Sequence, residues 1–132
     1  MSITFAISGL YASLLGLLLL VLSLNIIRLR LKFQIGIGDG KQKILTRAIR
    51  VHANFIEYMP LALILLVCYE SHGAEALWLH ILGMTLLLGR ILHAIGLGKS
   101  VRVSLGRQLG MLLTFVALFF LAFENVRLFL SA

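Results

Sequence analysis

The chain has 132 residues, of which 61% are hydrophobic and 13% charged, and its formal net charge is +7. Soluble domains are about half apolar and a quarter charged, so this composition excludes a soluble globular protein and predicts one integral membrane domain, residues 1–132. A chain that lies mostly in the bilayer leaves little surface for nucleic acid, so we expect its basic excess to face membrane lipids.

Four long apolar segments follow one another along the sequence. A helix needs about 20 apolar residues to cross the hydrocarbon core. The segments therefore predict an all-α, multi-pass bundle of four transmembrane helices, at about residues 4–33, 45–70, 74–97 and 104–130. They are continuous leucine-rich runs without in–out alternation, which argues against a β-barrel.

The connections between these segments differ in charge. All but one of the 12 Lys and Arg flank the first and third connections, whereas the second carries Glu70 and Glu75 and no cation. The positive-inside rule then predicts a cytoplasmic first and third connection and both termini on the non-cytoplasmic side. The first connection contains G-I-G-D-G at 36–40. No strand precedes it, so we interpret it as a glycine-rich turn and not as a dinucleotide fingerprint.

Polar residues cluster at the start of the second segment. On a helical wheel, five of them fall within an arc of roughly 100°: Arg47, Arg50, Asn54, Glu57 and Tyr58. His52 falls on the opposite side of the same helix. Charged groups inside a membrane helix cost ~2.5–3.5 kcal/mol each on insertion scales, so this face is expected to serve a ligand.

Further cations are expected at the same depth in the other helices. They are Arg28 and Arg30 in the first, Arg90 and His93 in the third, and Arg102 and Arg107 at the start of the fourth. A four-helix bundle would gather them around a single carboxylate, Glu57. One interpretation is an ion-pair network with the other arginines reaching the interface. The excess of cations favours another, an anionic ligand that also carries an amino group.

Small residues recur in three of the segments. Gly9, Gly16, Gly83 and Gly89, and the G-x-x-x-G of Gly106 and Gly110, are expected to permit close helix packing. Gly96 and Gly98 are expected to stop the third helix. The histidines at 52, 72, 80 and 93 do not have the spacing of zinc ligands, so no metal site is predicted.

The run R-x-x-R-x-H-x-N-x-x-E-Y-x-P at 47–60 resembles the hallmark of the membrane-associated proteins in eicosanoid and glutathione metabolism, the MAPEG family. The R-x-R pair closing the first helix and the G-R-x-x-H of the third fit the same family. The G-D-G turn and R-Q-L-G-M at 107–111 are similar to a bacterial subgroup, which implies an inner-membrane location. The resemblance implies a homotrimer that binds glutathione as co-substrate between neighbouring subunits. It also implies a glutathione transferase, like the microsomal enzymes, that conjugates the thiolate to hydrophobic electrophiles and has peroxidase activity.

The resemblance also implies roles for individual residues. Glutathione would be bound from one subunit by Arg50, Asn54, Glu57 and Tyr58. His52 and Arg30 would reach in from the adjacent subunit, and Arg90 and His93 would lie beside the ligand. The family's catalytic arginine aligns without gaps to Ser104, and a shift of a few residues offers Arg107 or Arg102. We predict Arg107, with Arg102 as the runner-up. Leu97 stands where the eicosanoid enzymes have tyrosine, which argues against their lipid substrates.

Two alternatives remain open at this stage. One is a small four-helix transporter that uses Glu57 as its coupling carboxylate. The surrounding arginines argue against it, because a cation exporter would not place positive charge around that group. The other is a family member that binds glutathione or a lipid without catalysis.

Overall fold

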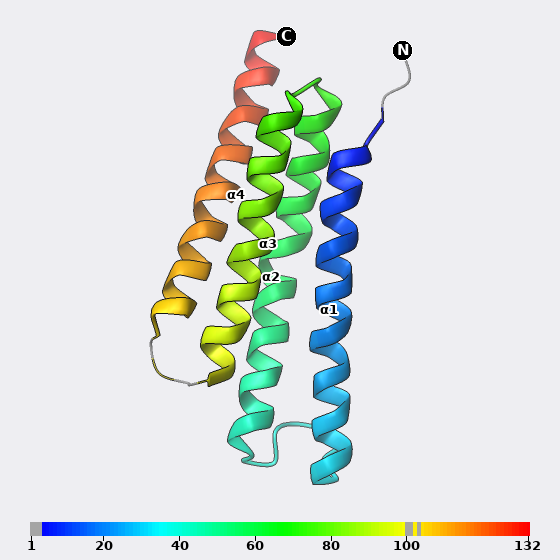
Figure 1. The fold of residues 1–132 in the computed structure, drawn as a ribbon, viewed down its shortest axis with the longest axis vertical. Coiled ribbons are helices and arrows are strands. Elements are labelled where there is room, and N and C mark those ends of the chain that lie inside the picture. The colour runs from blue at the N-terminus through cyan, green and yellow to red at the C-terminus, as the bar shows by residue number, and fades with distance from the viewer. Residues whose placement is uncertain (1–3, 100–101, 103) are drawn as a thin grey trace.

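The computed structural model describes residues 4–99, 102 and 104–132, and four long helices make up the fold (Figure 1). They are α1 (Ala6–Phe33), α2 (Lys43–Ser71), α3 (Ala76–Lys99) and α4 (Leu105–Ser131). Each is long and apolar enough to cross a membrane, so the predicted all-α membrane architecture is confirmed. The helix ends differ from the expected ones by at most two residues.

The helices run antiparallel to their neighbours in sequence (Figure 1). The α1–α2 and α3–α4 connections therefore lie at one end of the bundle, here called the basic end. The α2–α3 connection, the start of α1 and the end of α4 lie at the other end, here called the acidic end. Within the described residues, α1 packs on α2 and α3 and makes no contact with α4.

The core lies along the centre of the bundle and receives side chains from all four helices. Leu15, Leu66, Leu86 and Leu121 are each fully buried there. Large apolar side chains also cover the outside, as at Phe119, which is 74% exposed. In water such a surface would be unstable, but in a bilayer it faces acyl chains while the helical backbone satisfies its own hydrogen bonds.

Glycines allow α3 and α4 to approach closely. A Cβ atom on Gly110 would lie 2.5 Å from the Gly89 carbonyl oxygen and 2.6 Å from the His93 nitrogen. The prediction that Gly96 stops α3 is wrong, because the helix continues to Lys99. Gly96 instead accommodates α4, since a Cβ atom there would collide with the Arg107 nitrogen.

Not every glycine has this packing role. Gly9 and Gly16 face open space, and a Cβ atom on either would meet nothing within 4 Å among the described residues. In α3, by contrast, a side chain on Gly83 would collide with the Tyr11 ring of α1. The expected close packing is therefore found for Gly83, Gly89 and Gly110 and is absent for the two α1 glycines.

Side chains from other helices attach α1 to the bundle. At its start, the Glu70 carboxylate of α2 accepts hydrogen bonds from the Ile7 amide at 3.1 Å and the Ser8 amide at 2.7 Å. These amides belong to the first turn of α1, where no intrahelical acceptor exists. One turn later, the hydroxyl of buried Tyr11 lies 2.9 Å from His80 Nδ1 of α3.

The glycine-rich turn predicted between α1 and α2 is present, with positive φ at Gly38 and Gly40. Asp39 organises it by accepting hydrogen bonds from the Thr46 hydroxyl at 2.6 Å and the Lys41 amide at 2.9 Å. These two donors hold the pKa of the Asp39 carboxyl below its ordinary value of 3.8. The connection is thereby tied to the first turn of α2.

Candidate functional site

A cavity of about 220 Å³ opens at the basic end, where α2, α3 and α4 meet. It is lined by Thr46, Arg47, Arg50, Asn54, His93, Leu97 and Arg107. Four of the predicted ligand or catalytic residues thus converge on one space: Arg50, Asn54, His93 and Arg107. Their side chains offer cations, an amide and an imidazole, which suits an anionic ligand with further hydrogen-bonding groups.

Arg107 reaches the cavity because of how α4 begins. Ser104 is the N-cap residue, and its hydroxyl accepts a hydrogen bond from the Arg107 amide at 3.3 Å. This arrangement fixes Arg107 in the first turn of α4, directly against Gly96 of α3. The three positions considered for the catalytic arginine therefore differ: Ser104 caps the helix, Arg107 lines the cavity, and Arg102 is an exposed residue of the connection.

Arg90 lies beneath the cavity with only 2% of its surface exposed. Its Nη1 donates to the Asn54 amide oxygen at 2.5 Å, and its Nη2 donates to the Thr114 hydroxyl at 2.9 Å and the Met111 sulfur at 3.3 Å. These acceptors are all neutral. Among the described residues no carboxylate pairs with this guanidinium, so it contributes positive charge close to the cavity, and it fixes the orientation of the Asn54 side chain.

Glu57 and Tyr58 lie further along the same face of α2. The Tyr58 ring packs edge-on against Phe115 at 5.5 Å between centroids and lies 5.9 Å from the Arg90 guanidinium carbon. Glu57 approaches Arg50 to 3.9 Å, with both side chains more than half exposed. At that separation and exposure the pair is weak, so both groups are accessible to a ligand at the protomer surface.

His52 and Arg30 lie on the other side of α2, away from this cavity. His52 Nε2 lies 3.0 Å from the Ser23 hydroxyl of α1. Arg30 donates to the Gly38 carbonyl at 2.8 Å and the Ile35 carbonyl at 3.4 Å. The opposite orientation of His52 expected from the wheel is thus present, and within one protomer neither residue meets Arg107.

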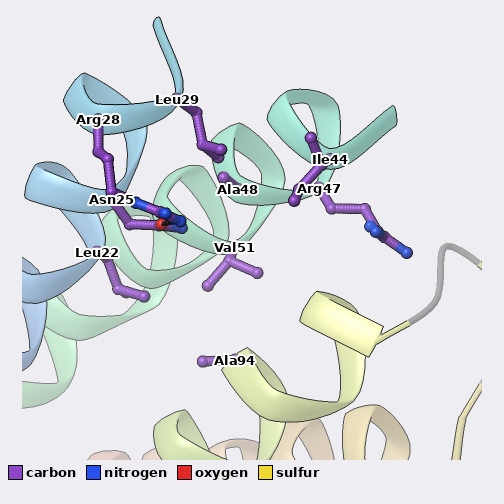
Figure 2. A pocket seen from close by; sticks show the side chains of 9 residues that line it. All are labelled: Leu22, Asn25, Arg28, Leu29, Ile44, Arg47, Ala48, Val51 and Ala94. Atoms are coloured by element: carbon purple, nitrogen blue, oxygen red, sulfur yellow. Dashed lines mark hydrogen bonds between the residues drawn. The ribbon is translucent and has the colours of Figure 1, made fainter. Parts of the chain in front are cut away.

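A second cavity of about 190 Å³ lies at the same end between α1, α2 and α3. Figure 2 shows that Asn25 and Arg28 meet on one side of it, joined by a hydrogen bond of 2.9 Å, while Arg47 points away from them. Arg47 lines both cavities, so it lies between the site on the α4 side and the groove on the α1 side.

Some residues of the site were not predicted from the sequence. Thr46 lines the first cavity, and the helical wheel could have identified it, because it falls about 40° from Arg50. Thr114 and Met111 bind Arg90 from α4. No spacing pattern in the sequence points to these two, since their role depends on how α3 and α4 pack.

Comparisons with known proteins agree with this architecture. The family model described as MAPEG family matches residues 8–127. The chain is 39% identical over 120 residues to the inner membrane protein YecN of Escherichia coli K12, covering 91% of this chain and 90% of the relative. The corresponding protein of Escherichia coli O6:H1 gives the same identity and coverage. The chain is therefore a multi-pass membrane protein that belongs to the MAPEG family.

Proposed function

We propose that the protein is a membrane-bound glutathione transferase. The observation that carries this proposal is the convergence of Arg50, Asn54, His93 and Arg107 on one cavity at the basic end. Glutathione has two carboxylates, one ammonium group and one thiol. Arginine side chains match its carboxylates, and Glu57, accessible beside Arg50, matches its ammonium group.

The chemistry requires a thiolate. A free thiol has a pKa near 8.5 and is mostly protonated at neutral pH, whereas the thiolate is the nucleophile. The Arg107 guanidinium stabilises the thiolate by charge and hydrogen bonding in a site of low dielectric, and buried Arg90 adds to the positive potential. The thiol proton leaves to water, and the sulfur attacks a hydrophobic electrophile arriving from the bilayer.

The same thiolate accounts for a peroxidase reaction. It attacks the distal oxygen of a lipid hydroperoxide, releases the alcohol, and a second glutathione then yields the disulfide and water. Both reactions remove reactive hydrophobic compounds from the membrane, so detoxification is the role that we infer.

The size of the cavity supports a ligand site shared between subunits. At about 220 Å³ it is smaller than the ~300–1,000 Å³ usual for ligand sites, so one protomer supplies only part of the binding surface. We infer that in a homotrimer the missing part comes from a neighbour and includes His52 and Arg30, which lie away from this cavity in their own subunit. We infer a bacterial inner-membrane location with the basic end cytoplasmic and both termini outside.

Two measurements test the proposal. Isothermal titration calorimetry of the purified protein in detergent is expected to show glutathione binding, and a chlorodinitrobenzene assay is expected to show conjugation. Arg107→Ala should reduce the thiolate ultraviolet absorbance of bound glutathione and the turnover, while Arg102→Ala, as the matched control, keeps both. Absence of glutathione binding by the wild type would refute the proposal.

The two alternatives give different outcomes in these experiments. A protein that binds glutathione without catalysis would show a binding enthalpy but no thiolate absorbance sensitive to Arg107. A transporter coupled through Glu57 would show flux into liposomes that Glu57→Gln abolishes. Glu57 lies beside Arg50, whose positive charge partly neutralises the Glu57 carboxylate. This position argues against Glu57 as the group that binds a transported cation.

A further inference from the structure

The cavity at the acidic end, about 410 Å³ in volume, is larger than the two cavities described above at the basic end. It lies where the last turn of α2, the first turn of α3 and the last turns of α4 meet. The residues of interest in its lining are Tyr69, Glu75, Trp78, Phe120, Glu124 and Arg127. None of them belongs to the proposed glutathione site, so this cavity has a separate chemistry.

The charge of this cavity is opposite to that of the basic end. Arg127 binds the Glu124 carboxylate through Nε at 3.0 and 3.2 Å and Nη2 at 2.6 Å, which neutralises that group. Glu75 is exposed and forms no ion pair within the described part of the chain. The lining therefore carries one net negative charge beside a bound arginine, an arrangement that suits a zwitterion with an accessible cation.

Aromatic rings form the wall next to these charges. Trp78 stacks on Phe120 with 5.5 Å between ring centroids and 20° between ring planes, and it remains 42% exposed. A tryptophan face attracts an ammonium group within about 6 Å. Tryptophan and tyrosine are also enriched at the membrane–water interface, which is the depth expected for residues in the terminal turns of three membrane helices.

The outer surface beside the cavity is suited to acyl chains. Phe119 and Phe123 stack with centroids 6.4 Å apart, and they are 74% and 55% exposed. Phe123 lies about 60° round α4 from Phe120, so this ring pair lies beside the cavity wall on the exposed surface of α4. A molecule bound in the cavity can therefore extend its apolar part along α4 within the bilayer.

The geometry points to a binding site for the head group of a phospholipid with a primary ammonium, phosphatidylethanolamine. The ammonium lies against the Glu75 carboxylate and the Trp78 face, and the phosphodiester lies against Arg127, whose side chain is 53% exposed. The acyl chains follow Phe119 and Phe123. A primary ammonium donates three hydrogen bonds to carboxylates, whereas the quaternary ammonium of choline donates none, so the site prefers ethanolamine.

Trp78, the sole tryptophan of the chain, reports on this site directly. Short-chain phosphatidylethanolamine titrated into the detergent-solubilised protein is expected to shift its emission. Phosphatidylcholine of equal chain length should need about a tenfold higher concentration, and phosphatidylglycerol and free ethanolamine should give no shift. Equal half-saturation concentrations for ethanolamine and choline lipids would overturn the proposed head-group recognition. If free ethanolamine shifted the emission as much as the lipid does, the ligand would be the free amine and not a phospholipid.

Two variants separate the charged and aromatic contributions. Glu75→Gln should remove the preference for ethanolamine over choline lipid, while Glu57→Gln, the matched control at the basic end, retains it. Trp78→Leu should lose ethanolamine lipid in native mass spectrometry, with thermal unfolding showing that the variant folds. An unchanged preference for ethanolamine lipid in Glu75→Gln, or wild-type levels of that lipid on folded Trp78→Leu, would contradict the proposal.

Discussion

The Arg90 guanidinium on α3 donates a hydrogen bond of 2.5 Å to the Asn54 amide oxygen on α2. Because Asn54 lines the cavity and Arg90 is buried behind it, this contact links the third helix to the cavity-lining side of the second. The other terminal nitrogen of the guanidinium, Nη2, donates a hydrogen bond to the Thr114 hydroxyl of α4. A single side chain thus joins the three helices that form the cavity.

Replacing Arg90 by lysine tests this arrangement. Lysine keeps the positive charge but lacks the planar fork that reaches Asn54 and Thr114 together. We expect Arg90→Lys to lower the melting temperature in detergent and, on the proposed function, to raise the glutathione Kd about tenfold. The matched control, Arg127→Lys at the exposed ion pair of the acidic end, should leave the Kd unchanged. A wild-type Kd in Arg90→Lys would show that the fork does not position Asn54.

Gly110→Ala is expected to destabilise the protein by ~1–3 kcal/mol, because the added methyl group meets backbone atoms of α3 that cannot move independently. Gly16→Ala is the control within the same chain. Its methyl group enters open space, so the higher helix propensity of alanine should make it neutral or stabilising. Thermal unfolding in one detergent compares the melting temperatures of Gly110→Ala and Gly16→Ala. Equal melting temperatures would show that α4 does not pack closely against α3 at Gly110.

Glu70→Gln is expected to weaken the start of α1. Only one oxygen of glutamine can accept a hydrogen bond, so either the Ile7 or the Ser8 amide loses its acceptor. Loss of such a cap costs ~0.5–2 kcal/mol. Hydrogen exchange at Ile7 and Ser8 should become faster, while Glu75→Gln, in the exposed connection that follows, should leave both amides protected as in the wild type. Unchanged exchange in Glu70→Gln would mean that the carboxylate does not cap α1.

The first connection is expected to loosen in acid. The pKa of Asp39 is lowered in the folded protein, so its hydrogen bonds contribute fully above the ordinary value of 3.8 and are lost as the pH falls through the lower, folded-state pKa. The protection factor of the Lys41 amide, which corrects hydrogen exchange for its intrinsic pH dependence, should fall over that range. Asp39→Asn, which keeps only one acceptor oxygen, should show lower protection that does not change over this range, and a constant Lys41 protection factor in the wild type would argue against this role of the carboxylate.

Much of the fold follows from the sequence because the bilayer restricts what an apolar segment can do. Four apolar runs predicted four helices, and the polar spacing along α2 placed Arg47, Arg50 and Asn54 on one face, where they line one cavity. His52 was correctly assigned to the opposite face by the same periodicity. Helical geometry fixes these relations within one segment, so they needed no tertiary information.

Contacts between residues of different helices were harder to predict from the sequence. Ser104, Arg107 and Arg102 could not be separated by alignment, since their orientation depends on the residue at which α4 begins. Gly96 was interpreted as a stop because glycine often ends helices, whereas here the absence of its side chain makes room for α4. The partners of Arg90 depend on the register between α3 and α4, which no single segment encodes.

The cap that Glu70 provides has a consequence for the order of assembly. Ile7 and Ser8 are separated from their acceptor by 63 and 62 residues of chain. When synthesis proceeds from the N-terminus, these amides have no protein acceptor until the far end of α2 has been made and has returned to the side of the membrane where α1 begins. The α1–α2 hairpin is therefore the smallest part of the chain that contains both these amides and the carboxylate that accepts from them.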